Sequence, residues 1–315
     1  MRKFSLLCFV ALMPCFARAE TLPLDAALRA TYTACVGIED KLSEYKTLAG
    51  INTAVSGVGT GLGVGATVTG IVKASTDRVA AQYEELLEKL REIESSEDDT
   101  ETDAQIDADA FRKEFNLSYE DAVKDIDKYE SELDKLNQKS KKLGNWRTGL
   151  LAGETVTGVT GAVLAAKSGA NGDIQDMVKV CVQSLSDLNN SILAARLGGE
   201  DVSEANEIFN ACRDYSTVDV SSISKRAKGA EISSIIGAST AATGTIVSAV
   251  ANSNQVRDDN TDAGKKKEKN LNTASNVLAG TSTVASAAAT VFSGTQIAAI
   301  KRVAEVASKC EGVLK

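Results

Sequence analysis

Residues 47–72 read TLAGINTAVSGVGTGLGVGATVTGIV, a run without one charged side chain. Glycine recurs every fourth residue at Gly57, Gly61 and Gly65, and Gly59 and Gly63 form a second row with the same spacing. Small residues at helical spacing let two helix backbones approach closely, in a membrane or in a dry soluble bundle. The glycines also alternate with larger residues, so a half-buried β-strand is the competing interpretation.

Three further stretches share this composition of Gly, Ala, Ser, Thr and Val: residues 148–166, 232–256 and 270–300, interrupted only by Glu154. The chain contains two prolines, and it is rich in helix-forming residues, so we expect an all-α protein. The glycines that we expect on a helix-packing or membrane-facing surface are Gly57, Gly61, Gly65, Gly158, Gly161, Gly237, Gly244 and Gly280.

Residues 76–142 predict a coiled-coil stalk, because apolar residues recur at alternating spacings of four and three. Between its two arms, residues 94–109 carry many acidic side chains and no basic one, so we expect an acidic tip at the turn. The apolar stripe of the first arm is Val79, Tyr83, Leu86, Leu90 and Ile93, and that of the second is Phe115, Tyr119, Ala122, Ile126, Tyr129, Leu133 and Leu136.

Folding the first half of the sequence back on itself about residue 108 aligns three independent features. The two arms of the stalk face each other, residues 47–72 face 144–169, and Cys35 falls opposite Cys181. This coincidence predicts an antiparallel helical hairpin over residues 20–182.

The second half repeats this order about a centre near residue 262. Residues 232–256 then face 268–292, and Cys212 falls opposite residue 312, two places from Cys310. We therefore expect a second hairpin over residues 212–315. Four cysteines after residue 19 allow three pairings, and the symmetry favours Cys35–Cys181 and Cys212–Cys310, each closing the open end of one hairpin.

A helical connector over residues 183–211 is expected between the hairpins. Gly198 and Gly199 end one helix, and Asp201 with Glu204 reads as a capping box that opens the next. The predicted fold is thus two long antiparallel helical hairpins, whose four small-residue segments form a four-helix bundle. The first hairpin extends beyond this bundle as the stalk.

Residues 1–19 have the pattern of a Sec signal peptide. Arg2 and Lys3 precede an apolar run, and Ala17-Arg18-Ala19 provides a small-x-small cleavage site. The expected destination is the periplasm, the envelope surface or the outside of the cell, where cysteines are oxidised.

The composition excludes several classes of function. Forty-three acidic residues against 35 basic ones argue against binding to nucleic acid. The absence of histidine excludes imidazole bases and Ser-His triads, and the cysteines are too far apart in sequence for a typical zinc site. We therefore predict no catalytic residue, cofactor or metal centre.

Three local features each have two interpretations. The acidic tip is a solvated loop, or it binds a cation or a basic partner weakly. The basic cluster of residues 265–269 is a solvated turn at the tip of the second hairpin, or it contacts anionic lipid headgroups. Trp146 plugs the junction of stalk and bundle, or it anchors at a membrane surface.

The expected function is that of an exported, non-enzymatic structural or partner-binding protein of the cell envelope or extracellular space. The alternative is a membrane-inserting, pore-forming protein that uses the glycine-rich segments. The partner is accordingly another protein or a lipid bilayer, and self-association into a homo-oligomer suits either role. The signal peptide, the coiled-coil arms and the small-residue segments together resemble, at the level of architecture, the general plan of α-helical pore-forming toxins.

Overall fold

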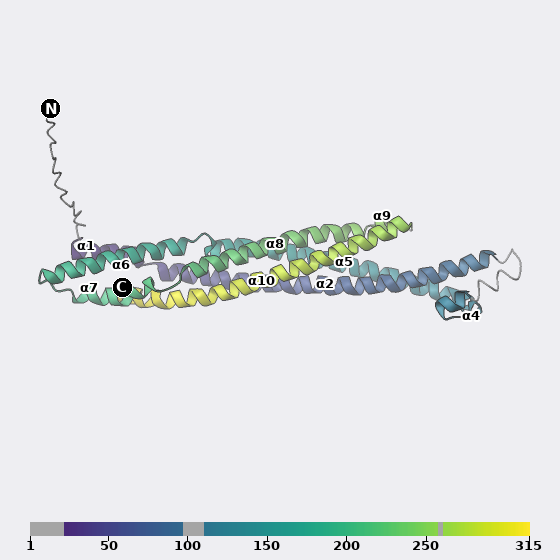
Figure 1. The fold of residues 1–315 in the computed structure, drawn as a ribbon, viewed down its shortest axis with the longest axis horizontal. Coiled ribbons are helices and arrows are strands. Elements are labelled where there is room, and N and C mark those ends of the chain that lie inside the picture. Colours follow the sequence, from purple (N-terminus) through teal and green to yellow (C-terminus); the bar gives the residue numbers. More distant parts are fainter. Residues whose placement is uncertain (1–21, 97–109, 258–260) are drawn as a thin grey trace, which may run out of the picture. The chain divides into compact units, whose positions relative to one another are not determined.

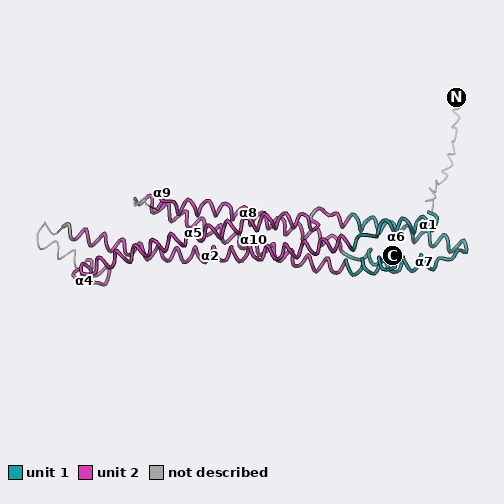
Figure 2. The backbone as a smooth tube through the Cα atoms, turned by 180° about the vertical axis from the view of Figure 1, so that it is seen from behind, with its two compact units in different colours: residues 1–39, 176–218, 304–315 teal, residues 40–175, 219–303 magenta. Residues whose placement is uncertain are grey.

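The computed structural model describes residues 22–96, 110–257 and 261–315, which are almost entirely helical and contain no strand. The predicted leader and nearly all of the acidic tip lie outside these residues. The chain divides into two compact units, of which unit 1 comprises residues 1–39, 176–218 and 304–315, and unit 2 comprises residues 40–175 and 219–303 (Figure 2). Three helices, α2, α6 and α10, contribute to both units.

Unit 2 is built on four long helices, α2 (Ile38–Ser96), α5 (Ile126–Ala165), α8 (Ser221–Ala251) and α10 (Asp262–Leu314) (Figure 1). Helix α2 packs antiparallel to α5, and α8 packs antiparallel to α10, which confirms the all-α class and the helical hairpins. The strand interpretation of the glycine run is wrong, because α2 continues through it without a break.

Pairs of residues in contact give the register of each hairpin. Glu154 lies over Gly63 and Leu150 over Gly65, so the first hairpin is centred within one residue of position 108. Leu278 lies over Gly244, which centres the second hairpin on residue 261, one place before the predicted centre.

The stalk differs from the predicted pair of continuous arms. Its second arm is interrupted after the helical residues 110–115, because Asn116 has a φ of 51°. Helix α4 (Tyr119–Lys124) restarts at Ser118, whose hydroxyl accepts the backbone N–H of Asp121 at 3.2 Å. The predicted seam over residues 115–136 is therefore wrong as a single helix. Its apolar residues instead help to enclose a small core, whose buried members are Leu86, Leu87, Leu90, Ile93, Phe111 and Ala122.

The far end of α5 also breaks, at the π-helical turn η1 (Ala166–Ala170). Gly169 adopts a φ of +114° there, and the Tyr45 ring lies 2.9 Å from the position where a Cβ would stand. Gly172 has a φ of +83°. Both backbone conformations favour glycine, so the chain turns at residues 169–172 before α6 (Asp173–Leu197) begins.

Unit 1 contains α1 (Leu24–Cys35), most of α6, α7 (Ser203–Cys212), the short 3₁₀ turn η2 (Arg213–Ser216) and the end of α10. Disulfides join Cys35 to Cys181 and Cys212 to Cys310, the two pairs that the hairpin symmetry predicts. They favour an oxidising, extracytoplasmic compartment. The core of this unit is conventionally apolar and includes Leu185, Leu188, Ile192, Ala205, Ile208 and Ala307.

The turn between α6 and α7 corrects one local prediction. Gly199, at φ +80°, follows the end of α6 as expected, and its N–H donates to the carbonyl of Arg196. The capping box does not form. The carboxylate of Asp201 instead accepts the N–H and hydroxyl of Ser203 at 2.9 and 2.6 Å, which lowers the pKa of Asp201.

The basic cluster of residues 265–269 lies within helix α10, so the prediction of a solvated turn is wrong for these residues. The short helix α9 (Asn254–Arg257) precedes the three residues at the tip that the structure does not describe.

Candidate functional site

Unit 2 carries a zone without exposed charge, which we call the belt. It consists of residues 47–72 on α2, 148–166 on α5 and η1, 232–256 on α8 and α9, and 270–300 on α10. The shortest of these segments is about 28 Å long at 1.5 Å per residue, close to the thickness of a bilayer core. Four helical stretches in the described part of the chain are long and apolar enough to cross a membrane.

The large apolar side chains of the belt face outward. In the most apolar window of each of the four stretches, only 22 to 39% of the residues are buried. Val156 is 66% exposed on α5, Ile246 65% on α8 and Val284 70% on α10. The other large apolar residues exposed in the belt are Ile51, Val58, Val64, Val68, Ile71, Val72, Val159, Val163, Ile232, Ile235, Ile236, Val250, Val277, Val291 and Phe292.

The interior of the belt is small and polar. The buried polar residues are Asn52, Ser56, Glu154, Ser234, Ser248, Ser275, Ser282, Ser286, Ser293 and Gln296. Among the residues that the structure describes, the large aliphatic side chains buried in the belt are Leu151, Val256 and Ile300, and the last two lie at its ends. The distribution is therefore the reverse of that in unit 1, where leucine and isoleucine fill the core.

Threonine hydroxyls on the belt are satisfied within their own helices. Thr60 donates to the carbonyl of Ser56 at 2.9 Å, Thr155 to that of Leu151 and Thr281 to that of Val277, each four residues earlier. The same bond is made by Thr53, Thr67, Thr69, Thr160, Thr240, Thr243, Thr245 and Thr290. Such a threonine needs no water to satisfy its hydroxyl donor.

Glu154 lies at the centre of the interior and is fully buried. Its Oε2 accepts the hydroxyl of Ser282 at 2.8 Å, and its Oε1 accepts that of Ser286 at 3.1 Å. Both serines come from α10, while Gly63 of α2 leaves room for the carboxylate on the other side. This one charged residue of the segments therefore joins three helices.

Two further buried contacts join α10 to α2 and to η1 on one side of Glu154. Asn52 Nδ2 donates to Ser293 Oγ at 2.7 Å, and Gln296 Nε2 donates to the carbonyl of Ser168 at 2.6 Å. Toward the opposite end of the belt, Arg147 is only 1% exposed. Its guanidinium lies over Gly70, and its Nε and Nη2 make no hydrogen bond.

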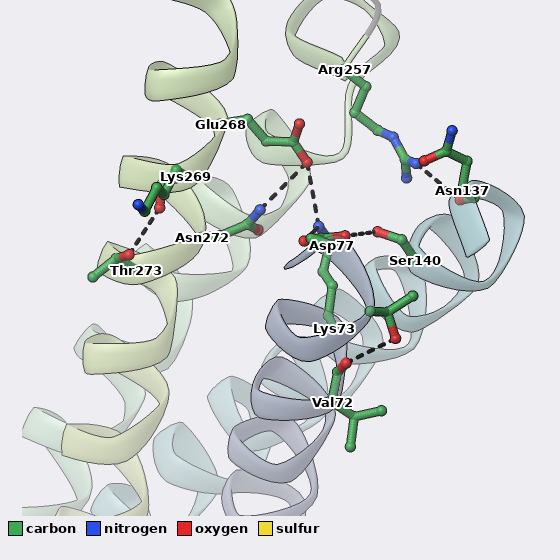
Figure 3. A network of polar contacts seen from close by, with 11 residues as sticks. Val72, Lys73, Asp77, Asn137, Ser140, Arg257, Glu268, Lys269, Asn272 and Thr273 are labelled. Carbon is green, nitrogen blue, oxygen red and sulfur yellow. Dashed lines mark hydrogen bonds and ion pairs between the residues drawn. The ribbon is translucent and has the colours of Figure 1, made fainter. Parts of the chain in front are cut away.

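A network of charged and amide groups closes that end of the belt (Figure 3). Lys73 is 1% exposed, and its Nζ lies 2.7 Å from Asp77 and 3.4 Å from Glu268. Asp77 also accepts the hydroxyl of Ser140, while Arg257 donates to the carbonyl of Asn137 at 3.0 Å. The network thereby joins α2, α5, α9 and α10.

The predicted glycine positions fall into two groups. A Cβ at Gly158, Gly161, Gly237 or Gly244 would meet atoms of a neighbouring helix, and Gly65 lies against the side chain of Leu150. Gly57, Gly61 and Gly280 face open space, with no heavy atom within 4 Å of the place where a Cβ would stand. On α2 the closely packed row is instead Gly59, Gly63 and Gly70.

Trp146 corrects another expectation. It is 71% exposed, so it does not plug the junction of stalk and bundle. It lies just beyond the belt on α5, beside an open groove of about 490 Å³ lined also by Leu62, Asn145, Gly149 and Leu150. Its position at the edge of the apolar surface fits the other interpretation, an anchor at a membrane interface.

Unit 1 holds a buried carboxylate with a structural task. Glu311 is 1% exposed, and its Oε1 accepts the N–H groups of Gly37 and Glu39 at 3.2 and 2.8 Å, at the start of α2. Burial, together with the nearby charges of Glu311 and Glu39, raises the pKa of Tyr215. Two disulfides and these capping hydrogen bonds thus connect the helices of unit 1.

Sequence reasoning identified Glu154 as the one charge in the segments but not its partners. It missed Asn52, Gln296 and Glu311, because their partners lie more than a hundred residues away. The outward position of valine and isoleucine had no clear sequence signal, since threonines such as Thr160 and Thr243 are also exposed on these helices. Comparison with protein-family models, curated proteins and solved structures finds no match to this chain.

Proposed function

We propose that this protein inserts into lipid bilayers through the belt, as a four-helix bundle with an apolar outside and a polar inside. The observation that carries this proposal is the inverted distribution of side chains in unit 2. Monomeric soluble proteins rarely expose large contiguous apolar patches, whereas in a bilayer the same surface is in its preferred solvent.

Rough energies favour insertion over exposure to water. Full burial of a valine or isoleucine contributes about 1.5–3 kcal/mol, so a half-exposed one contributes about 1 kcal/mol on leaving water. More than a dozen such residues surround the belt. A charged residue at the bilayer centre costs roughly 2.5–3.5 kcal/mol on insertion scales, but Glu154 is enclosed by protein.

The two edges of the belt support the same proposal. Lys46, Lys167 and Lys301 are exposed where three of the segments begin or end, and Lys269 is exposed at the opposite edge. Trp146 lies just beyond that opposite edge on α5. Lysine and tryptophan are the residues expected where a helix meets the headgroup region.

Vesicle binding tests this function directly. The oxidised protein is mixed with neutral phosphatidylcholine vesicles and with vesicles containing anionic lipid, and flotation, dye release and tryptophan emission are recorded together. Trp146 is the single tryptophan of the chain, so a blue shift of its emission reports on one site. We expect flotation with both lipids and a blue shift. Dye release identifies the inserted form as a pore.

Two matched variants sharpen this experiment. Val156→Lys places a charge on the outer face of the belt, while Val180→Lys places one at a position of unit 1 that is 58% exposed. The first is expected to weaken vesicle binding by about tenfold or more, given about 2.5–3.5 kcal/mol for a lysine at the bilayer centre. The second should bind as the unchanged protein does. Equal binding by both variants, or no flotation at all, contradicts the proposal.

The exported partner-binding role remains the alternative. The stalk, with its own apolar core and exposed charges, suits contact with another protein. A protein that stays monodisperse in buffer and ignores vesicles fits this role instead.

A further inference from the structure

Three hydroxyl groups lie around the Glu154 carboxylate in the centre of unit 2. Besides the hydroxyls of Ser282 and Ser286 on its two oxygens, the side chain of Thr283 lies on the Oε1 side. They converge because α2 has glycine at position 63. A Cβ at Gly63 would stand 2.6 Å from Glu154 Oε1 and against Thr283 Oγ1.

The carboxylate has no counter-charge. Within the described residues no lysine or arginine lies within ion-pair distance of Glu154, and the nearest basic residue on its own helix, Arg147, is seven residues away. Each carboxylate oxygen lies within hydrogen-bond distance of one serine hydroxyl. A fully buried carboxylate without a positive partner is costly, because hydroxyl dipoles replace only part of its hydration.

The hydroxyl groups can turn their lone pairs toward a cation. Thr283 already donates to the carbonyl of Ala279 at 2.7 Å. Ser282 also has the Ala279 carbonyl within 3.0 Å as a second acceptor. Two of the three hydroxyls therefore have a backbone acceptor for their proton, which leaves the oxygen free to coordinate.

From this arrangement we infer that unit 2 binds one Na⁺ ion between α2, α5 and α10. Glu154 supplies the balancing charge, and Ser282, Ser286 and Thr283 supply neutral oxygens. Hard cations take oxygen ligands, and a divalent ion such as Ca²⁺ is normally held by several carboxylates. One carboxylate with three hydroxyls balances a single positive charge. The inference does not depend on insertion into a membrane.

Thermal unfolding at constant ionic strength tests the site. The oxidised full chain, in buffer or in a mild detergent, is titrated with NaCl in place of choline chloride, and with KCl in a parallel series. A ligand of the native state raises Tm in a saturable way. We expect this rise with NaCl, a weaker one with KCl, and none in choline chloride. Equal Tm values in NaCl and choline chloride overturn the inference.

Matched variants locate the ion. Glu154→Gln preserves the shape of the side chain and should weaken the Na⁺ response by more than about tenfold, because the one charged ligand is lost. Thr283→Val removes a hydroxyl ligand and should also weaken it, and this variant decides the matter if Glu154→Gln does not fold. Thr160→Val is the control, since its exposed hydroxyl bonds only to the carbonyl of Val156. A full Na⁺ response in Glu154→Gln or Thr283→Val contradicts the site.

The two proposals fail separately. A Na⁺ response without vesicle binding keeps the cation site and rejects membrane insertion. Vesicle binding without a Na⁺ response keeps membrane insertion and rejects the cation site.

Discussion

Replacing Gly63 with alanine places a methyl group against Glu154 and Thr283 in the centre of the bundle. We expect a loss of about 1–3 kcal/mol in the free energy of unfolding, since an added methyl in a filled interior forces its neighbours apart. Gly61→Ala, half a turn away, meets no atom within 4 Å. This variant should be neutral or more stable by up to about 1 kcal/mol, because alanine is the better helix former.

Circular dichroism during thermal unfolding measures both variants under identical conditions. Equal destabilisation by the two alanines would mean that α2 does not present its Gly59 and Gly63 row to the interior. The pair is well matched, because both substitutions add the same methyl group to the same helix.

The sequence alone could not show which of the two glycine rows on α2 is buried. Both rows repeat every four residues, and both are surrounded by valine and threonine. The difference comes from α5 and α10, whose side chains Thr157, Glu154 and Thr283 need the space left by Gly59 and Gly63. Helical spacing thus predicts that a glycine row exists, while the neighbouring helices decide which row is buried.

At the scale of single helices, the start of α2 depends on a residue near the other end of the chain. Glu311→Ala removes the acceptor for the N–H groups of Gly37 and Glu39. We expect a cost of about 1–2 kcal/mol, similar to the loss of a helix cap. Glu311→Gln keeps a side-chain oxygen at this place and should lose less.

Amide hydrogen exchange of residues 37–39, compared with residues 60–62 on the same helix, locates the effect. Faster exchange confined to the first turn of α2 is the expected result for Glu311→Ala. Unchanged protection of the Glu39 amide would contradict the capping role.

The long helices and their register could be read from the sequence, but the interruptions could not. Pairing about residue 108 works because a stripe, a segment and a cysteine all repeat around one centre. The break at Asn116 and the turn at Gly169 have no such symmetry. Each interruption depends on a local backbone conformation. Gly169 is one of many glycines in the chain, and only its contact with the Tyr45 ring in the structure shows why glycine is needed there.

At the scale of the whole molecule, two disulfides close long loops, with sequence separations of 146 and 98 residues. The chain-entropy model assigns about 4–5 kcal/mol to each, and measured losses for native disulfides are typically about 2–5 kcal/mol. We therefore expect the double variants Cys35→Ser with Cys181→Ser, and Cys212→Ser with Cys310→Ser, each to lower Tm strongly.

Thermal unfolding of both double variants, with non-reducing peptide mapping of the unchanged protein, checks this prediction. A peptide that links Cys35 to Cys212 would contradict the fold. Melting of the reduced protein at the same temperature as the oxidised one would show that the bridges do not stabilise it.

The separation of outward valine from inward serine also bears on the predicted export of the chain through a translocon. That machinery reads one segment at a time, and it partitions each by its total hydrophobicity. The serine, asparagine and glycine that fill the interior lower the hydrophobicity of each segment taken alone. Under the proposed function, secretion and later insertion are compatible in one sequence, because these polar residues are covered once the four helices have assembled.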